Sequence, residues 1–424
     1  MAMHRRTFVL SGLTAAASAR IAGANDRLRI GIVGPGAHGS GLLRGFHDHH
    51  KQLNAELAAV CDLWSKRRTD AAARVKELGG NEPVQHQRYA DLLAMKDLNG
   101  VIIATPDHQH ARQLVQAVRA GKDVYCEKPM ANTLAEAKQA FKAVKASKQV
   151  VQLGTQGLST GNYQAARAFV QSGKLGKISR ISHEGSFNGP RWRPIAAVKE
   201  IREQDTDWKA WLDGHRMRPF DPNLYFEFRL YREFSSGIPN QWITHAVAGV
   251  NHIMDDYFPE SVTASGGVMV FKDGRENSDT FHATYIFPKG FVYDYSAQFG
   301  NDYPGHSRYY GENGTLERVS NSGAEGAGFV AKGLGGGKRP QRLAADVPVQ
   351  PIKPVHHMRN WLECMRTRAT PNADVLSGYA HSVAAMMAAR AEVTGRRIHW
   401  DPRREEITDR PVQRSAPASE RAPA

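Results

Sequence analysis

The chain has 424 residues, of which 41% are apolar, so it is long enough to form two domains that each bury a core. Its formal net charge of +14 would suit a nucleic-acid partner. The basic residues are scattered, however, and accompany no aromatic-and-basic binding motif, so we exclude that class. The three cysteines, Cys61, Cys126 and Cys364, are typical of core residues; their spacing suggests neither a disulfide framework nor a zinc site, and we predict no metal centre.

Residues 1–24 are typical of an export signal rather than of a folded segment. The twin arginine Arg5-Arg6 precedes a short run rich in small residues, which ends in the cleavage-site patterns 17–19 and 22–24. The apolar run is too short and too rich in alanine to span a membrane. The segment resembles a bacterial twin-arginine signal and predicts a periplasmic protein; a mildly basic, unstructured N-terminus is the alternative.

A glycine-rich turn follows the first predicted strand, residues 28–33. Its sequence, GPGAHG, fits the pattern GxGxxG, in which the glycines let the backbone turn sharply and approach a pyrophosphate at the start of the next helix. The residues predicted to bind the cofactor here are Gly34, Gly36, Ala37, His38 and Gly39.

A second apolar run, residues 57–61, ends in Asp62. A carboxylate at this point of a dinucleotide-binding fold is placed to bind both hydroxyls of the adenosine ribose, which favours NAD over NADP. Because Lys66, Arg67 and Arg68 follow closely, a 2′-phosphate is not excluded.

Strand-like and helix-like runs alternate as far as residue 154, which predicts a parallel, doubly wound sheet and a Rossmann domain over residues 27–155. Thr105, Pro106 and His108 follow another strand and should line the same cleft. His108 either packs near the cofactor or is an ordinary turn histidine.

The apolar run 124–126 leads directly into Glu127-Lys128-Pro129. This places a long cationic side chain at the carboxyl edge of the sheet, where open α/β folds bind ligands. Proline restricts Lys128 to an extended conformation, and a partly desolvated lysine can act as a general acid or base. A surface lysine beside a surface glutamate is the alternative.

Residues 156–400 have a different pattern, with period-two runs that predict an antiparallel sheet with one covered face. We predict strands at 262–270, 280–287 and 291–299, helices at 163–171, 356–364 and 376–394, a glycine-rich loop at 321–338 and a disordered tail at 410–424.

Several polar and aromatic residues of this second domain could hold a sugar. Asn188, Arg191 and Trp192 offer an amide, a guanidinium and an aromatic surface, and Tyr225 lies in a polar, aromatic loop. Trp208 and Trp211 in the same loop are better suited to packing.

The motifs together resemble one family. GPGAHG, Asp62, TPDHQH, CEKP, the GTQ of 154–156 and the C-terminal ADVLSGYAHSV…GRRIHWDP are similar to the Gfo/Idh/MocA family of NAD(P)-dependent sugar and cyclitol oxidoreductases, over nearly the whole chain after the signal. The resemblance implies an α/β protein: a Rossmann domain followed by an α/β domain with a large, mostly antiparallel open sheet. It also implies NAD as cofactor, a carbohydrate substrate, and Lys128 as the active-site lysine. We further expect a homo-oligomer formed through the open sheet.

The resemblance also implies a histidine that faces Lys128, and the best match is His245. Many members carry an aspartate four residues earlier, where this chain has Gln241, which can bind a substrate hydroxyl but cannot titrate. Proton transfer would then fall on Lys128 and His245, with Gln241 and Thr244 as substrate contacts. A core histidine is the alternative for His245, and His252 is a second choice for the role.

Three functions remain open. A dehydrogenase would pass hydride to the nicotinamide. A glycosidase would oxidise its substrate transiently, and the stretch from Asn240 to His245 resembles NAD-dependent α-N-acetylgalactosaminidases. A non-catalytic scaffold would only retain the cofactor. Because export would separate the protein from the free NAD pool, we expect either enzyme to keep its NAD bound.

Overall fold

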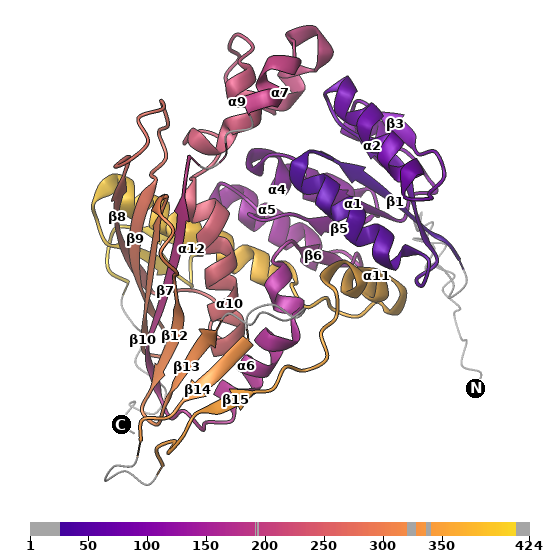
Figure 1. The fold of residues 1–424 in the computed structure, drawn as a ribbon. Helices are drawn as coiled ribbons and strands as arrows, with labels where there is room; N and C mark the ends of the chain where they lie inside the picture. Colours follow the sequence, from indigo (N-terminus) through magenta and orange to yellow (C-terminus); the bar gives the residue numbers. More distant parts are fainter. Residues whose placement is uncertain (1–25, 191, 193–194, 320–327, 336–340, 413–424) are drawn as a thin grey trace, which may run out of the picture.

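The computed structural model describes residues 26–190, 192, 195–319, 328–335 and 341–412. The predicted signal segment 1–24 lies outside the described residues, and so do Arg191 and nearly all of the predicted tail 410–424. Within the described ranges the chain forms two sheets with helices between and around them (Figure 1).

The first sheet is parallel throughout, with strand order β3-β2-β1-β4-β5-β6. Its central strands are buried on both faces, as apolar runs such as the predicted first strand require. The strands are β1 (Leu28–Val33), β2 (Ala55–Cys61), β3 (Val84–His86), β4 (Gly100–Ile103), β5 (Asp123–Cys126) and β6 (Val151–Leu153). The helices are α1 (Ala37–His50), α2 (Ser65–Glu77), α3 (Tyr89–Leu93), α4 (His110–Arg119) and α5 (Leu134–Lys145).

The second sheet has the order β15-β14-β13-β12-β7-β10-β9-β8-β16-β17, with β11 beside β7. Its neighbouring strands are antiparallel except for the parallel pair β10 and β7, so the predicted fold class is confirmed. The strands are β7 (Ile178–Asn188), β8 (Ser261–Gly267), β9 (Thr280–Phe287), β10 (Phe291–Gln298), β11 (Gly300–Asn301), β12 (Ser307–Gly311), β13 (Thr315–Val319), β14 (Gly328–Lys332), β15 (Val347–Val349), β16 (Ile398–Asp401) and β17 (Glu406–Thr408).

Side chains on β9 and β10 alternate strictly between the two faces of this sheet. Aromatic residues such as Tyr285 and Tyr293 face the core, against α6 (Gly161–Gln171), α10 (Thr244–Met254) and α12 (Val375–Thr394). The opposite face is polar and includes the ion pair between Arg180 and Asp294, whose closest atoms are 2.6 Å apart. Formation of an oligomer through this face stays a prediction.

Two sequence predictions in this domain are corrected. The strand predicted for 262–270 ends at Gly267, because the main-chain N–H groups of residues 269–271 donate instead to the buried carboxylate of Asp279. Part of the predicted loop 321–338 is strand β14, which pairs with β13 and β15.

A segment of short helices, residues 195–236, which we call the helical insert, connects β7 to the turn before α10. It contains α7 (Ile195–Glu200), η3 (Glu203–Asp205), α8 (Trp208–Leu212), α9 (Pro222–Glu227) and η4 (Phe228–Leu230). Aromatic side chains form its core, and Trp64 of the first domain belongs to the same cluster. The insert therefore spans the top of the molecule towards α2, as Figure 1 shows.

The chain returns to the first domain near its end. Helix α11 (His357–Thr367) places Trp361 and Met358 in the core beneath β1 and Tyr125. Among the helices of the described residues, none combines the length and apolar character that a membrane span requires. All three cysteines are buried and free, as predicted.

Candidate cofactor and substrate site

The three glycines of the loop between β1 and α1 have different reasons to be glycine. Gly34 has a φ of +74°, and a Cβ there would lie 2.7 Å from the main-chain nitrogen of Thr105. A Cβ on Gly39 would lie 2.6 Å from the carbonyl oxygen of Gly34. At Gly36, by contrast, the nearest atoms to an added Cβ are the flexible end of Arg67, at 3.2 Å. Gly34 and Gly39 are thus fixed by packing against the main chain, whereas the backbone at Gly36 is approached only by the flexible guanidinium end of Arg67.

Asp62 lies where the sequence predicts it, at the carboxyl end of β2. The side chain is 6% exposed, and one of its oxygens accepts a hydrogen bond of 2.9 Å from the main-chain N–H of Trp64. Burial raises the pKa of this carboxyl, and the charge of Arg67 opposes the shift. The arrangement suits a carboxylate that receives hydroxyl donors from a ribose.

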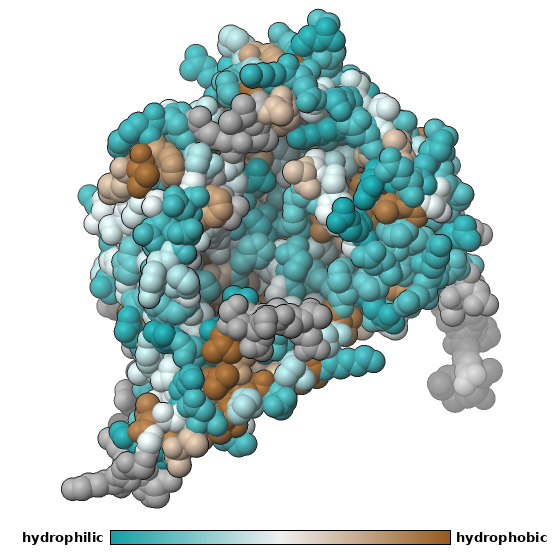
Figure 2. Space-filling view, in the orientation of Figure 1, coloured by the Kyte–Doolittle hydropathy of each residue, from teal (hydrophilic) through white to brown (hydrophobic). Residues whose placement is uncertain are grey.

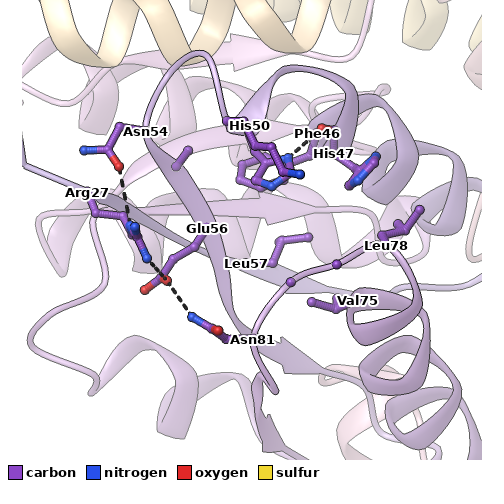
Figure 3. A pocket seen from close by; sticks show the side chains of 14 residues that line it. Arg27, Phe46, His47, His50, Asn54, Glu56, Leu57, Val75, Leu78 and Asn81 are labelled. Atoms are coloured by element: carbon purple, nitrogen blue, oxygen red, sulfur yellow. Dashed lines mark hydrogen bonds and ion pairs between the residues drawn. The ribbon is translucent and has the colours of Figure 1, made fainter.

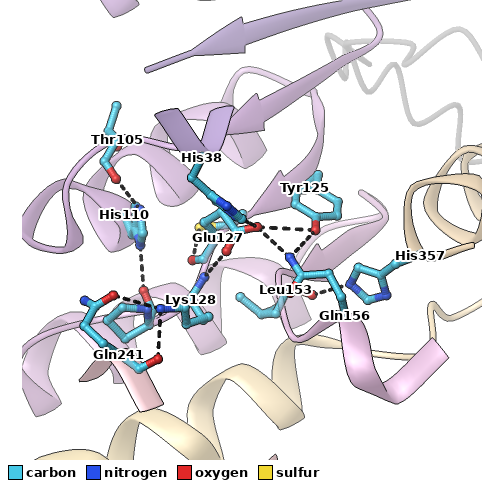
Figure 4. Close-up of polar contacts among 12 residues, drawn as sticks. His38, Thr105, His110, Tyr125, Glu127, Lys128, Leu153, Gln156, Gln241 and His357 are labelled. Atoms are coloured by element: carbon cyan, nitrogen blue, oxygen red, sulfur yellow. Dashed lines mark hydrogen bonds and ion pairs between the residues drawn. The ribbon is translucent and has the colours of Figure 1, made fainter. Parts of the chain in front are cut away.

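The residues after β4 divide into two groups. Thr105 and Pro106 lie beside the glycine loop, and the ring nitrogens of His110 lie 2.7 Å from the carbonyl oxygens of Thr105 and Pro129, so the ends of β4 and β5 are held together (Figure 4). His108 points elsewhere: its ring is buried against Phe234, and Nε2 lies 2.8 Å from the Trp211 carbonyl oxygen. Burial lowers the pKa of His108 to about 4. The placement favours packing over the predicted cofactor contact.

Glu127 connects separate parts of the first domain through one buried carboxylate. His38 Nε2 and Gln156 Nε2 each lie 2.8 Å from its Oε1, so the glycine loop and the segment after β6 meet at this side chain (Figure 4). Burial pushes the pKa of Glu127 upwards, but the bond to His38 and the surrounding positive charges outweigh it and bring the pKa to about 2. A Cβ on Gly154 would lie 2.4 Å from the carboxylate, which explains the glycine there.

Lys128 forms a bridge across the two domains. Its Nζ donates to Gln241 Oε1 over 2.9 Å, and Gln241 Nε2 donates to Asp107 Oδ2 over 2.5 Å. Because a carboxylate only accepts, the amide must turn its oxygen towards Lys128. Burial lowers the pKa of Lys128, although Asp107 and Glu127 oppose the shift. Gln241, predicted to bind substrate, is thus occupied by two protein groups.

His245 stands at the first turn of α10, on the same side as Lys128. The ring is exposed in the cleft, yet protein atoms crowd it closely enough that burial, followed by the charge of Lys128, lowers its pKa to about 3. The ring is therefore neutral near pH 7 and has a free lone pair to offer. This placement agrees with the predicted role better than with a core histidine.

Two predicted substrate contacts have buried side chains that pack against other protein groups, so the structure favours a packing role for them. Thr244 is 0% exposed, and its hydroxyl donates to the carbonyl oxygen of Asn240 over 2.7 Å. Tyr225 is 4% exposed and stacks on Trp211 inside the helical insert. As the sequence predicts, Trp208 and Trp211 serve packing; they are 4% and 2% exposed.

Aromatic side chains gather at the end of β7. Trp192 and Trp242 pack edge-on against Phe299, with ring centroids 5.2 and 5.0 Å from it. Asn188, the last residue of β7, is exposed and lies four residues before Trp192 in the chain. Arg191 lies outside the described residues. Figure 2 shows the surface hollowed between the two domains, with largely hydrophilic residues around the hollow.

Sequence reasoning missed several residues of this site. Asp107 lies in the TPDHQH motif and Gln156 in the GTQ motif, but the sequence pattern predicts a site role for neither of them. Arg229 comes from the helical insert, and its guanidinium lies 4.3 Å from the centroid of the Phe228 ring. Burial is the main cause that lowers the pKa of Lys128, and the charge of Arg229 adds to this shift. Contacts between segments far apart in the sequence bring these residues to the site.

Two of the cavities near the first domain adjoin α1. One, of about 920 Å³, runs between α1 and α11 and reaches His38, Tyr125 and Gln156. The other, of about 300 Å³, lies at the opposite edge of the sheet, between the end of α1 and the start of β2 (Figure 3). Arg27 and Asn81 both contact the Glu56 carboxylate there, at 3.3 and 3.4 Å. Since α1 separates it from the glycine loop, we do not assign it to the site. No cluster of metal-ligating side chains occurs in the described part of the chain.

Comparisons with known proteins agree with this geometry. Residues 28–155 match the Gfo/Idh/MocA model, described as an oxidoreductase family with an NAD-binding Rossmann fold. An inositol 2-dehydrogenase from Salmonella paratyphi B is 30% identical over 193 residues, which are 44% of this chain and 54% of that protein. The match thus spans about half the length of this curated relative.

Solved structures share the fold over most of the chain. An aldose-aldose oxidoreductase from Caulobacter crescentus, solved with glycerol, has a TM-score of 0.67 and 19% identity, over 88% of this chain and 99% of that one. The WlbA dehydrogenase from Bordetella pertussis, solved with NADH and UDP-GlcNAcA, has a TM-score of 0.65 and 19% identity, over the same shares of the two chains.

Proposed function

Since the chain belongs to the Gfo/Idh/MocA oxidoreductase family, we propose that it oxidises a hydroxyl of a sugar, glycoside or cyclitol and transfers the hydride to NAD. The observation that carries the proposal is the convergence of Lys128 and the neutral His245 at the carboxyl edge of the first sheet, beside a glycine loop whose second glycine meets only the flexible end of Arg67. The inositol dehydrogenase and aldose oxidoreductase relatives support the substrate class.

The residues present fit a dinucleotide. The main-chain N–H of Gly36 donates to the Gly34 carbonyl oxygen over 2.8 Å, so those of Ala37 and His38 at the start of α1 would hold the pyrophosphate. Asp62 would accept the ribose hydroxyls. When bound, NAD supplies the hydride acceptor. Asp62 favours NAD, as the sequence predicts.

Proton transfer in this site would fall to His245 and Lys128. His245 is neutral at physiological pH and can accept the proton of the substrate hydroxyl. Two hydrogen bonds of the Lys128 ammonium go to Gln241, and a third N–H remains for the oxygen that loses its proton. Gln241 orients Lys128 and takes no proton itself.

The glycosidase interpretation gains no support from the oxidoreductases that this chain matches, and the converging acid–base groups argue against a scaffold. Export by the twin-arginine segment remains our proposal from the sequence. An exported enzyme would have to retain its NAD and restore it within each cycle, for instance by reducing a second sugar.

Retention of the cofactor gives the first test of this function. Protein isolated without added nucleotide and then denatured is expected to release close to one NAD per chain. Sugars and cyclitols are then screened for reduction of the bound cofactor, read as NADH absorbance. Empty protein that consumes free NAD⁺ one-for-one with substrate would leave a conventional dehydrogenase and remove the closed cycle.

The glycine loop gives a second test. Gly36→Val is expected to weaken NAD binding by more than about tenfold, because the added side chain fills the space that the pyrophosphate requires. Gly41→Val is the matched control: Gly41 lies on α1, the helix that follows Gly36, and a Cβ there would meet no atom within 4 Å. Calorimetry on both variants decides the matter, and equal NAD affinities would place the cofactor elsewhere.

A further inference from the structure

The helical insert contacts the first domain at the cofactor edge of the sheet. Phe226, on α9, packs edge-on against Trp64, which follows Asp62; the ring centroids are 5.6 Å apart at 72°. The Arg67 guanidinium lies against both rings, 4.9 Å from the centroid of Phe226 and 5.5 Å from that of Trp64. Phe226 of the second domain thus packs against the charged side chain of Arg67 in the first domain.

Arg67 is held in a way that leaves its hydrogen-bonding capacity unused. Among the described residues its guanidinium forms no hydrogen bond and no ion pair, and its contacts are with ring faces. A guanidinium has five N–H donors in a planar fork that matches phosphate oxygens, and stacking on rings leaves those donors available. Such an arrangement suits an anion that comes from outside the chain.

The position of Arg67 indicates which anion this is. Its Cζ and Nη1 atoms lie 3.2 Å from the place where a Cβ on Gly36 would stand. Gly36 is the glycine at which a pyrophosphate approaches the backbone of such loops. The guanidinium therefore lies beside the predicted pyrophosphate.

The helical insert is attached to the first domain on both sides of α9 along the chain. Gln109 donates to the carbonyl oxygen of Trp211 over 2.8 Å, and Asn132 donates to that of Phe234 over 2.7 Å. Arg112 forms an ion pair with Asp213, with 2.7 Å between the closest atoms. Phe226 therefore sits on an anchored element and can restrain Arg67 continuously.

We propose that Arg67 binds the pyrophosphate of the cofactor, and that Phe226 is the positioning residue that holds it there from the other domain. The dinucleotide would leave only when its contact with Arg67 breaks. Because Phe226 holds the guanidinium in place, this contact slows cofactor release. This inference rests on the proposed function and names residues that would make retention possible.

The test follows release of NADH from the reduced holoprotein, by loss of its fluorescence after dilution into excess NAD⁺. Phe226→Ala is expected to raise the dissociation rate about tenfold, equivalent to the loss of one well-held charged contact. Phe226→Tyr keeps the ring and should restore the parent rate. Phe220→Ala is the matched control, because Phe220 packs on Trp208 in the same insert, at 5.4 Å between centroids, and forms no ring contact with Arg67.

Displacement of NADH by fragments tests Arg67 itself. Arg67→Met is expected to weaken competition by ADP, which carries the pyrophosphate, about tenfold and to leave competition by adenosine unchanged. Arg67→Lys should weaken ADP less. If Arg67→Met weakens NADPH but not NADH or ADP, the guanidinium serves a 2′-phosphate and the inference is wrong.

Other outcomes also separate the inference from the proposed function. Equal release rates in Phe226→Ala and Phe220→Ala would reduce the effect to general loosening of the insert and overturn the positioning role. A parent protein that binds no NAD at all would overturn the proposed function itself. A parent that binds NAD, with Phe226→Ala indistinguishable from it, would overturn the inference alone.

Discussion

Lys128→Met is expected to lower turnover by roughly 10²-fold or more, as loss of a general acid–base group does, while NAD affinity stays near that of the parent. Methionine keeps an unbranched side chain of similar length but cannot donate to the substrate oxygen. Gln241 would lose a donor, yet its bond to Asp107 keeps the amide in place. Turnover is measured from NADH absorbance, and cofactor binding by calorimetry.

The control for this change is Lys142→Met, which removes one lysine from the exposed face of α5 without touching the cleft. It should leave turnover unchanged. A Lys128→Met variant as active as the control would show that Lys128 takes no part in the chemistry.

His245→Ala should reduce turnover to a similar extent, roughly 10²-fold or more, because the neutral imidazole is the group placed to accept the hydroxyl proton. His245→Gln is the informative companion: it can still hydrogen-bond the substrate but has no titrating nitrogen. We expect KM to change less in the glutamine variant than in the alanine variant, with kcat low in both.

Steady-state kinetics on the two His245 variants separate the roles. If His245→Gln retains the turnover of the parent, the histidine only orients the substrate, and Lys128 is left as the sole acid–base group. His252, the second choice from the sequence, serves as control; its ring nitrogen Nε2 is buried and the residue lies further along α10.

Local patterns in the sequence predict most of the fold and several residues of the site. The glycine loop, Asp62 and the lysine after β5 each occupy the end of a parallel strand, so a correct strand assignment places them at one edge of the sheet. The alternation in β9 and β10 likewise predicts which face of the second sheet is covered.

Residues that depend on contact between domains could not be found in this way. The sequence predicts that Gln241 binds substrate. In the structure, the turn before α10 packs against η1 (Asp107–Gln109), and the two ends of the Gln241 amide bind Asp107 and Lys128. Tyr225 and Phe226 are neighbours in one aromatic run. The sequence pattern does not predict that Tyr225 packs inside the insert while Phe226 contacts Arg67.

The Gln241 amide between Lys128 and Asp107 limits the routes by which protons can reach the lysine. An aspartate at position 241 could exchange a proton with the lysine and connect it to the carboxylate of Asp107. A glutamine transmits the alignment of the hydrogen bonds but blocks conduction, because its nitrogen holds its protons and its oxygen does not take up another near neutral pH. Any proton that Lys128 gains or loses must therefore cross the open side of the cleft, where substrate and solvent lie.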